Sequence, residues 1–184
     1  MDVLHTDVQF RRKSMTIQVV LRSGDITTNV PVDCLISSIN SEGLWFGGVD
    51  EAIRRVAGDQ FHKQALQMLR QYGLHDGQVL SLPQQWEHAG SFHSVLFVVD
   101  DLQQPLNVLV FTALKKAESC GFRSVALPLM RTGVAAGIME RTQLEVVQAI
   151  KMGLLQFLND YPYSNMQINV VAYGIPSAIR LFLI

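Results

Sequence analysis

Two patterns of apolar and polar positions alternate along the chain, one typical of buried strands and the other of helices. Short apolar runs are separated by turn residues or by segments with apolar positions at helical spacing. Each short run predicts a buried β-strand. The predicted strands cover residues 15–21, 33–39, 78–83, 94–100, 124–130 and 166–174.

Three segments show the helical pattern. The first starts at Val49, continues past Gly58 and ends near Gly73, so it predicts one helix or a pair of helices. The second covers residues 106–119. Because strands and helices alternate, we expect an α/β sandwich with a mostly parallel sheet. The third segment runs from about Met139 to Asn159, and the residues it is expected to bury recur at spacings of three and four: Leu144, Val147, Ile150, Leu154 and Leu158.

The composition favours a folded globular protein. The 184 residues are 48% hydrophobic and 17% charged, and two domains of this total length would each have little core. We therefore expect a single domain over residues 1–184, in which residues 1–14 form an N-terminal extension. The formal net charge of -1 gives no general attraction to nucleic acid or to an anionic membrane, so we expect neither as a partner.

The cysteines and the N-terminus indicate a cytoplasmic protein. Cys34 and Cys120 are the only cysteines, and neither has a second Cys or a His at metal-ligand spacing. We therefore expect no disulfide framework, no metal and no cofactor. The N-terminus lacks the apolar stretch of a signal peptide, and no run approaches the roughly 18 apolar residues of a membrane span.

Two loops stand where ligands bind in parallel α/β sheets, beyond the carboxyl ends of strands. Residues 40–48 and 131–138 both contain glycine, and both are expected to lead into a helix N-terminus. Such termini offer unpaired N–H groups and a partial positive charge, so two of them would hold a diphosphate without Lys or Arg. Neither loop is a Walker, Rossmann or Gly-x-Ser-x-Gly motif, and a simple structural turn explains the second loop equally well.

Three polar residues near these loops are each explained by local structure when they are taken singly. Asp25 in "SGDIT" suits a turn, as does Asn40 at the end of a strand. Asp50 falls in the first turn of a predicted helix, where the helix dipole favours an acid. A functional role for Asp25 would be to accept a hydrogen bond from an exocyclic amine such as adenine N6.

Taken in order, these segments resemble the macrodomain family of ADP-ribose-binding modules. The family's Gly-Asp-Ile-Thr is matched by residues 24–27, its Asp-Ala-Ile-Val-Asn-Ala-Ala-Asn strand by "DCLISSIN", and its Gly-Gly-Val-Asp loop end by "GGVDEAI". Further on, "SVALPLMRTGVAAGI" is similar to the second phosphate loop, and "INVVAYG" is similar to the late strand. The resemblance covers residues 15–174 and implies a three-layer α/β/α sandwich with a mixed, mostly parallel central sheet.

The resemblance also implies a role for each matching residue. Asp25 would accept from adenine N6, the Ile26 N–H would bond a ring nitrogen, and Asn40 would contact hydroxyls of the distal ribose. Tyr173 would pack near the adenine, although packing in the core explains it equally well. The diphosphate would lie between two groups of residues, Gly47, Gly48 and Val49 on one side and Thr132, Gly133, Val134 and Ala135 on the other.

The prediction of catalysis depends on Asp50. In hydrolytic macrodomains the matching Asp, together with the Asn at position 40, positions or activates a water at the distal ribose. The resemblance therefore implies hydrolysis of mono-ADP-ribosyl protein or of O-acetyl-ADP-ribose, with the carboxylate contributing about 10²- to 10⁴-fold. The partner would be ADP-ribose or an ADP-ribosylated protein. A non-catalytic ADP-ribose reader and another nucleotide-phosphate binding module are the alternatives.

The chain departs from the family pattern at several positions. Ser37 replaces the first Asn of Asn-Ala-Ala-Asn. Trp45 and Phe46 replace loop glycines, so these side chains are expected to border the distal ribose as an aromatic lid or to close the cleft in part. In the second loop, Arg131 stands where Ser is usual, and Ala135 stands where an aromatic residue is frequent.

Overall fold

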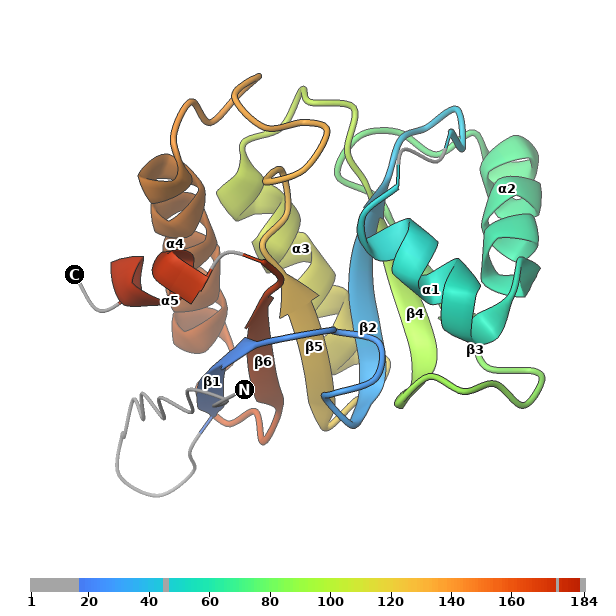
Figure 1. Cartoon of the computed structure of the whole chain (residues 1–184), viewed down its shortest axis with the longest axis horizontal. Helices are drawn as coiled ribbons and strands as arrows, with labels where there is room; N and C mark the ends of the chain where they lie inside the picture. Colours follow the sequence, from blue (N-terminus) through green and yellow to red (C-terminus); the bar gives the residue numbers. More distant parts are fainter. Residues whose placement is uncertain (1–16, 45–46, 175, 183–184) are drawn as a thin grey trace.

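The computed structural model describes residues 17–44, 47–174 and 176–182 (Figure 1). The N-terminal extension expected at residues 1–14 lies outside these ranges. The strands are β1 (Gln18–Ser23), β2 (Val32–Ile39), β3 (Val79–Pro83), β4 (Phe92–Val99), β5 (Ser124–Pro128) and β6 (Gln167–Ala172). The helices are α1 (Val49–Ala57), α2 (Gln60–Tyr72), α3 (Leu106–Ser119), α4 (Gln143–Asp160) and α5 (Pro176–Leu181).

All six strands belong to one sheet. Their order is β1-β6-β5-β2-β4-β3, and every neighbouring pair is parallel except β3 and β4, which are antiparallel. Parallel neighbours require crossover connections, and helices supply most of them here (Figure 1). The prediction of a mixed, mostly parallel sheet is confirmed.

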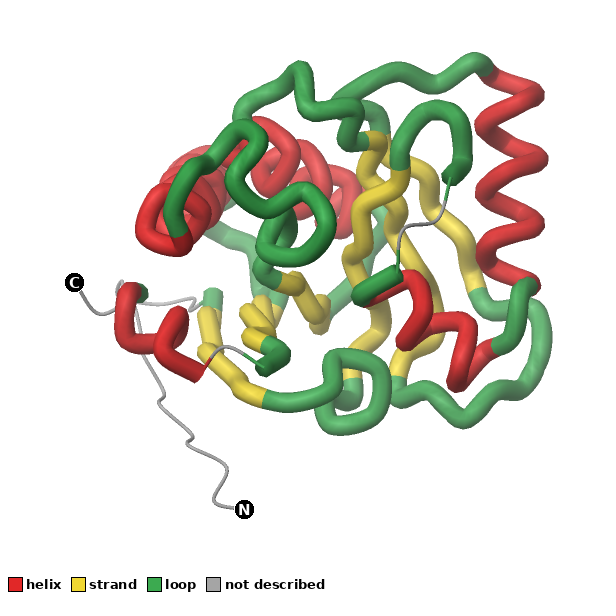
Figure 2. Tube along the Cα trace, turned by 45° about the horizontal axis from the view of Figure 1, so that its top comes forward, coloured by secondary structure: helices red, strands yellow, loops and turns green. Residues whose placement is uncertain are grey.

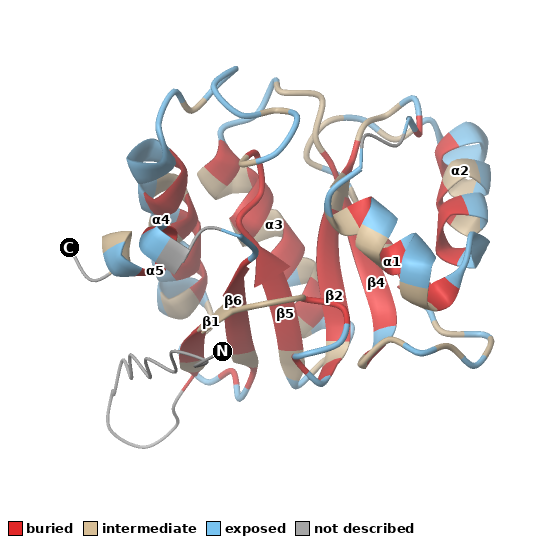
Figure 3. Cartoon of the chain, viewed as in Figure 1, coloured by how far each residue is buried: buried red, intermediate tan, exposed pale blue. Residues whose placement is uncertain are grey.

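Helices cover both faces of the sheet, as the alternation of side chains along β4 shows. Val95, Phe97 and Val99 pack in a core with residues of α1 and α2. Leu96 and Val98 point the other way and pack with residues of α3 and α4. Figure 3 shows the burial concentrated in the strands and on the inner sides of the helices. The prediction of a three-layer α/β/α sandwich is thus confirmed.

One of the two forms predicted for residues 49–73 is observed, and α4 begins later than predicted. Residues 49–73 form a pair of helices, α1 and α2, interrupted at Gly58 and Asp59. Helix α4 begins at Gln143 rather than near Met139, because the preceding residues form a succession of turns. The predicted burial of Leu144 was wrong, since it lies in the first turn of α4 and is 41% exposed. Further along α4, three residues of the predicted stripe are buried and Leu158 is partly buried: Val147, Ile150 and Leu154.

The direction of winding reverses between β2 and β5, which are neighbours at the centre of the sheet. From β2 the chain crosses through α1 to β3 and β4 on one side, and from β5 it crosses through α4 to β6 on the other. The pairing of β2 with β5 joins Cys34 to Val125 and Leu35 to Ala126, in the first half of β2. In open α/β sheets, ligands bind at such a reversal, beyond the carboxyl ends of the strands. The two loops singled out from the sequence follow β2 and β5, so both emerge at this edge (Figure 2).

Candidate functional site

The first loop ends in an open helix N-terminus. Gly47 and Gly48 have φ angles of 94° and 68°, which L-residues with side chains rarely adopt. A Cβ atom built on either glycine would meet no described atom within 4 Å beyond its chain neighbours, and both glycines are exposed. Gly48 is the N-cap of α1, and no side chain of the described residues caps this helix. Within those residues the first N–H groups of α1 thus have no side-chain acceptor, and they suit an anion.

Asp50 lies on the buried side of α1. Asp50, Ile53 and Ala57 recur at spacings of three and four and are the buried residues of this helix. The Asp50 side chain accepts a hydrogen bond from the Ser37 hydroxyl on β2, with 2.9 Å between Ser37 Oγ and Asp50 Oδ1. Burial raises the pKa of Asp50 to about 7, although the Ser37 hydrogen bond acts to lower it. Near neutral pH this carboxyl exists as acid and as carboxylate, which suits proton transfer.

Asn40 follows β2 directly and stabilises the loop after it. Its side-chain oxygen accepts from the Leu44 N–H at 2.8 Å, and its main-chain oxygen accepts from the Gly43 N–H at 3.0 Å. The Ser41 N–H donates to Asp101 at 2.8 Å, which holds the loop to the end of β4. The local explanation of Asn40 as a turn residue is therefore correct. Its amide –NH₂ group takes no part in these bonds and is the group that would donate to a ligand.

The Asp25 carboxylate is held by two residues. The Thr27 N–H and hydroxyl both donate to Asp25 Oδ1, at 2.8 and 2.6 Å, and Arg55 of α1 pairs with Oδ2. Burial alone would raise the pKa of Asp25, but the hydrogen bonds from Thr27 and the charge of Arg55 outweigh it and lower the pKa. Asp25 thus forms the turn expected from local structure. Ile26 beside it has a buried side chain.

The aromatic residues of the predicted site have different outcomes. Tyr173 follows β6 and is 75% exposed, so the explanation that it fills the core is wrong. Its predicted place beside the adenine stays a prediction. Trp45 and Phe46 lie outside the described residues, and so does the prediction made for them.

The second loop begins at a buried arginine that the sequence did not mark as a structural centre. Arg131 has a φ of 61°, and its side chain is 1% exposed. The guanidinium donates through Nε and Nη2 to the two oxygens of Asp100, at 3.0 and 2.8 Å. It also donates through Nη1 to Glu140, at 3.0 and 3.1 Å, and through Nη2 to the main-chain oxygen of Gln104, at 2.8 Å.

These contacts make Arg131 a clamp. Burial alone would lower the pKa of Arg131, but the bonds and charges of Asp100 and Glu140 raise it above its usual value. The clamp joins the start of the second loop to its end and to the segment after β4. The guanidinium charge is thereby paired with two carboxylates of the protein itself. The only signal in the sequence was a basic residue at a position where Ser is usual, which does not reveal its partners.

The remaining predicted residues of the second loop lie between the ends of this clamp. The Thr132 hydroxyl donates to the main-chain oxygen of Leu129 at 2.6 Å. Gly133 and Val134 are exposed, and Ala135 is half-buried. The Ala136 N–H donates to the oxygen of Gly133 at 3.0 Å, so the loop is a defined turn.

The second loop leads into α4 through residues 139–142, and a side chain caps the N-terminus of this helix. Thr142 is the N-cap of α4, and its hydroxyl oxygen accepts from the Glu145 N–H at 3.2 Å. The Glu145 carboxylate accepts in turn from the Arg141 N–H at 2.6 Å. This reciprocal arrangement resembles a capping box, in which side chains of the helix satisfy its own first N–H groups. Helix α1 is therefore the open terminus of the two.

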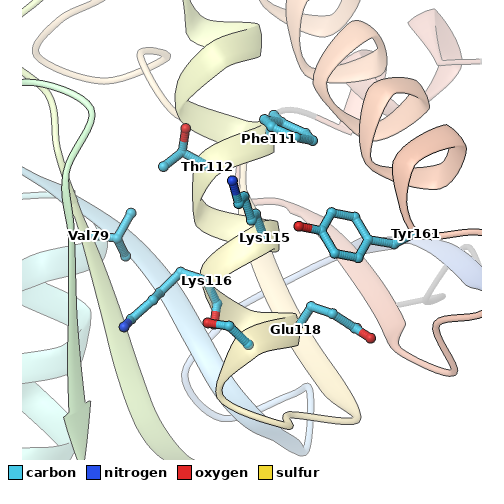
Figure 4. A pocket seen from close by; sticks show the side chains of 8 residues that line it. Val79, Phe111, Thr112, Lys115, Lys116, Glu118 and Tyr161 are labelled. Atoms are coloured by element: carbon cyan, nitrogen blue, oxygen red, sulfur yellow. The ribbon is translucent and has the colours of Figure 1, made fainter.

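A hollow of about 380 Å³ lies elsewhere, beside the second half of α3 (Figure 4). Val79 of β3 and Tyr161 after α4 flank it, and Lys115 and Lys116 extend from α3. Glu118 at its border accepts a hydrogen bond from Ser164. It does not include any residue of the predicted site, so we do not assign it the ligand.

The described ranges contain no group of three or more His, Cys, Asp or Glu side chains arranged to hold a metal ion. Over the same ranges, every helix is too short or too polar to cross a membrane.

Known proteins are similar to this chain in sequence, and solved structures are similar to it in fold. The family model of the Macro domain matches residues 36–143. An O-acetyl-ADP-ribose deacetylase of Escherichia fergusonii is 31% identical over 126 residues, which cover 65% of this chain and 71% of that protein. The Oceanobacillus iheyensis macrodomain with ADP has a TM-score of 0.77 at 20% identity, covering 98% of this chain and 94% of that one. The Trypanosoma brucei macrodomain in complex with ADP-ribose has a TM-score of 0.69 at 20% identity, covering 89% and 67%.

The matched segment contains both loops of the candidate site, with Asn40 and Asp50, whereas Asp25, Ile26 and Tyr173 lie outside it. It begins within β2, includes α1 and β5, and ends where α4 begins. The two solved structures share the three-layer architecture over nearly all of this chain. The resemblance inferred from the sequence is confirmed, and the chain belongs to the Macro domain family.

Proposed function

We propose that this macrodomain binds ADP-ribose at the reversal between β2 and β5 and hydrolyses an acyl linkage to its distal ribose. The substrate would be a protein carrying mono-ADP-ribose on an acidic side chain, or O-acetyl-ADP-ribose. Support comes from the family, from a relative named for deacetylation of O-acetyl-ADP-ribose, and from related structures with ADP and ADP-ribose. The cytoplasm would supply both substrates.

The observation that carries the proposal is the state of Asp50. A carboxyl with a pKa of about 7, beside an open helix N-terminus, is poised to exchange protons near neutral pH. As carboxylate, Asp50 would take a proton from water while the water oxygen forms a bond to the acyl carbon. The acyl bond to the ribose oxygen would then break, and Asp50 would return the proton to that oxygen. The products are a free carboxylic acid and ADP-ribose.

The backbone would hold the diphosphate. The net charge of the chain is only -1, and the Arg131 guanidinium is already paired with Asp100 and Glu140. The N–H groups after Gly47 and Gly48, at the start of α1, would therefore bind the phosphates from one side. Residues 132–135, fixed between the ends of the Arg131 clamp, would bind them from the other.

The remaining ligand contacts would come from residues at the ends of β1, β2 and β6. The Asp25 carboxylate would accept from the adenine amine beside its existing partners, since a carboxylate has about four acceptor sites. The Ile26 N–H would bond the ring, and Tyr173 would pack against it. The Asn40 amide would donate to the distal ribose.

The test compares Asp50→Asn with a matched control, Glu51→Gln. Both variants change a carboxylate to an amide in the first turn of α1, but Glu51 is exposed. We expect Asp50→Asn to bind ADP-ribose within about threefold of the wild type in calorimetry. Its release of ADP-ribose or acetate should fall by about 10²- to 10⁴-fold, whereas Glu51→Gln should keep full activity.

Three results would contradict this proposal. Wild-type protein that binds ADP-ribose without turnover over hours would be a reader, which is the alternative raised from the sequence. Wild-type protein that fails to bind ADP-ribose but binds another phosphate ligand would be a different nucleotide-binding module. Unchanged turnover in Asp50→Asn would remove Asp50 from the mechanism.

A further inference from the structure

Ser37 and Asp50 are two polar residues that face each other inside an apolar layer. Side chains on one face of a strand recur at every second position, so Ser37 shares its face of β2 with Leu35 and Ile39. Those two neighbours belong to the core formed with α1 and α2. Asp50 similarly occupies the buried stripe of α1, one turn before Ile53. Both polar groups thus occupy positions where the pattern of each element calls for an apolar side chain.

The contact between them is well shielded from solvent. Ser37 is 2% exposed and Asp50 is 8% exposed, and the hydroxyl donates to Asp50 Oδ1 at 2.9 Å. Ser37 is also the ladder partner of Phe97 on β4, which is buried. An unpaired polar group in such surroundings costs free energy. The pair is therefore a specific arrangement in which each group satisfies the other.

Charged groups of the neighbouring elements are engaged elsewhere. On α1 itself, Glu51 and Arg54 pair with each other on the exposed side, and Arg55 pairs with Asp25 of the loop after β1. Across β2, β4 and α1, the influences on the Asp50 pKa are burial and the Ser37 hydroxyl, and no charged residue of the described chain is among them. Among the described residues, Ser37 is thus the side chain whose hydrogen bond lowers the pKa of this carboxyl.

We propose that Ser37 is the positioning residue of Asp50, holding one carboxyl oxygen so that the other is presented to the reacting water. This inference rests on the proposed hydrolytic function. A hydroxyl can donate to the carboxylate and, after rotating, accept from the protonated acid. Ser37 therefore keeps the carboxyl oriented both when Asp50 takes the proton and when it returns it. Ser37 acts only through Asp50 and does not touch the substrate.

Loss of the Ser37 hydroxyl should raise the pKa of Asp50. The Ser37 bond favours the ionised form, so its removal weakens the opposition to burial and raises the pKa of Asp50 further. A hydrogen bond to a charged group is worth about a tenfold change in the acid constant. At pH 7 the ionised fraction would fall from about half to about a tenth, so turnover would drop about fivefold from ionisation alone. Activity should recover in part as the pH is raised.

The test follows Asp50 directly, in variants of the full chain. The Asp50 carboxyl is titrated by ¹³C NMR, with its signal assigned by Asp50→Asn, in the wild type, Ser37→Ala and Ser38→Ala. Ser38 is the matched control, because it is the next residue of β2 and points to the opposite face. Ser37→Cys, which is close in volume and a weaker donor, is measured in parallel in case the alanine variant folds poorly.

We expect the Asp50 titration to move to higher pH in Ser37→Ala and Ser37→Cys and to stay unchanged in Ser38→Ala. The pH profile of kcat/KM should move in the same direction. A wild-type midpoint in both Ser37 variants would overturn the positioning role. The NMR titration needs no ligand, so it separates failure of this inference from failure of the proposed function, which would appear as absent turnover in the wild type.

Discussion

Replacement of Asp50 by Asn should make the protein more stable than the wild type at alkaline pH but not at acidic pH. The pKa of Asp50 is about 7 in the folded protein, against the ordinary value of 3.8. Because the folded state holds this proton more tightly, the resulting stability is fully present below pH 3.8 and is lost as the pH rises to 7. The total loss is about 4 kcal/mol, at 1.4 kcal/mol for each pH unit.

The change in the free energy of unfolding is conveniently measured between pH 5 and pH 8. At pH 5 the unfolded chain is already ionised at this position, so about two pH units of the loss remain before pH 7. The amide that replaces the Asp50 carboxyl would not titrate, and any cost of burying it is the same at both pH values. The free energy of unfolding of Asp50→Asn, relative to the wild type, should therefore rise by about 2–3 kcal/mol from pH 5 to pH 8.

Urea unfolding at pH 5 and pH 8, followed by circular dichroism, measures this difference. Glu51→Gln is the control, because Glu51 is exposed and pairs with Arg54 on the surface. We expect its effect on stability to be nearly the same at both pH values. If the difference between Asp50→Asn and the wild type does not grow with pH, Asp50 is not held in a desolvated site, and the argument for its catalytic readiness fails.

Three further substitutions test other parts of the site. Arg131→Ala should lower the free energy of unfolding by about 3–5 kcal/mol in urea, because Asp100 and Glu140 would be left without their partner; an effect under about 1 kcal/mol would show that the clamp does not stabilise the second loop. Thr142→Ala should cost about 1 kcal/mol in thermal unfolding through loss of the α4 cap, and it should leave ADP-ribose affinity unchanged if α4 is not the open terminus. Gly48→Ala should strain a backbone that has a φ of 68°, costing about 1–3 kcal/mol, and calorimetry should show weaker ADP-ribose binding; wild-type affinity would mean that this loop does not hold the diphosphate.

Much of the fold was readable from the sequence because its signals are local. Short apolar runs marked all six strands, and the predicted helix at residues 106–119 coincides with α3. The order of short motifs identified the family, and the candidate loops proved to follow adjacent central strands. Periodicity and turn chemistry act over a few residues, so a single sequence is sufficient to show them.

Helix ends were less readable. The apolar periodicity predicted α4 from about Met139, but the helix begins after Thr142, where a threonine and a glutamate close its N-terminus. Leu144 fitted the periodic stripe and is nevertheless exposed. Periodicity indicates which face of a helix is apolar, but the position at which the helix meets the core depends on the loop that precedes it.

The tertiary structure alone decided the state of the chemical groups. In the sequence, Ser37 was a departure from a family pattern and Asp50 an ordinary first-turn acid; in the fold they meet in an apolar layer, and the Asp50 pKa rises to about 7. Arg131 was similarly a substitution without a role until the fold placed Asp100 and Glu140 around its guanidinium. Residue types and local order determine strands, helices and family. Burial and pairing are properties of the tertiary structure, because desolvation and electrostatic interaction depend on which distant segments the fold brings together.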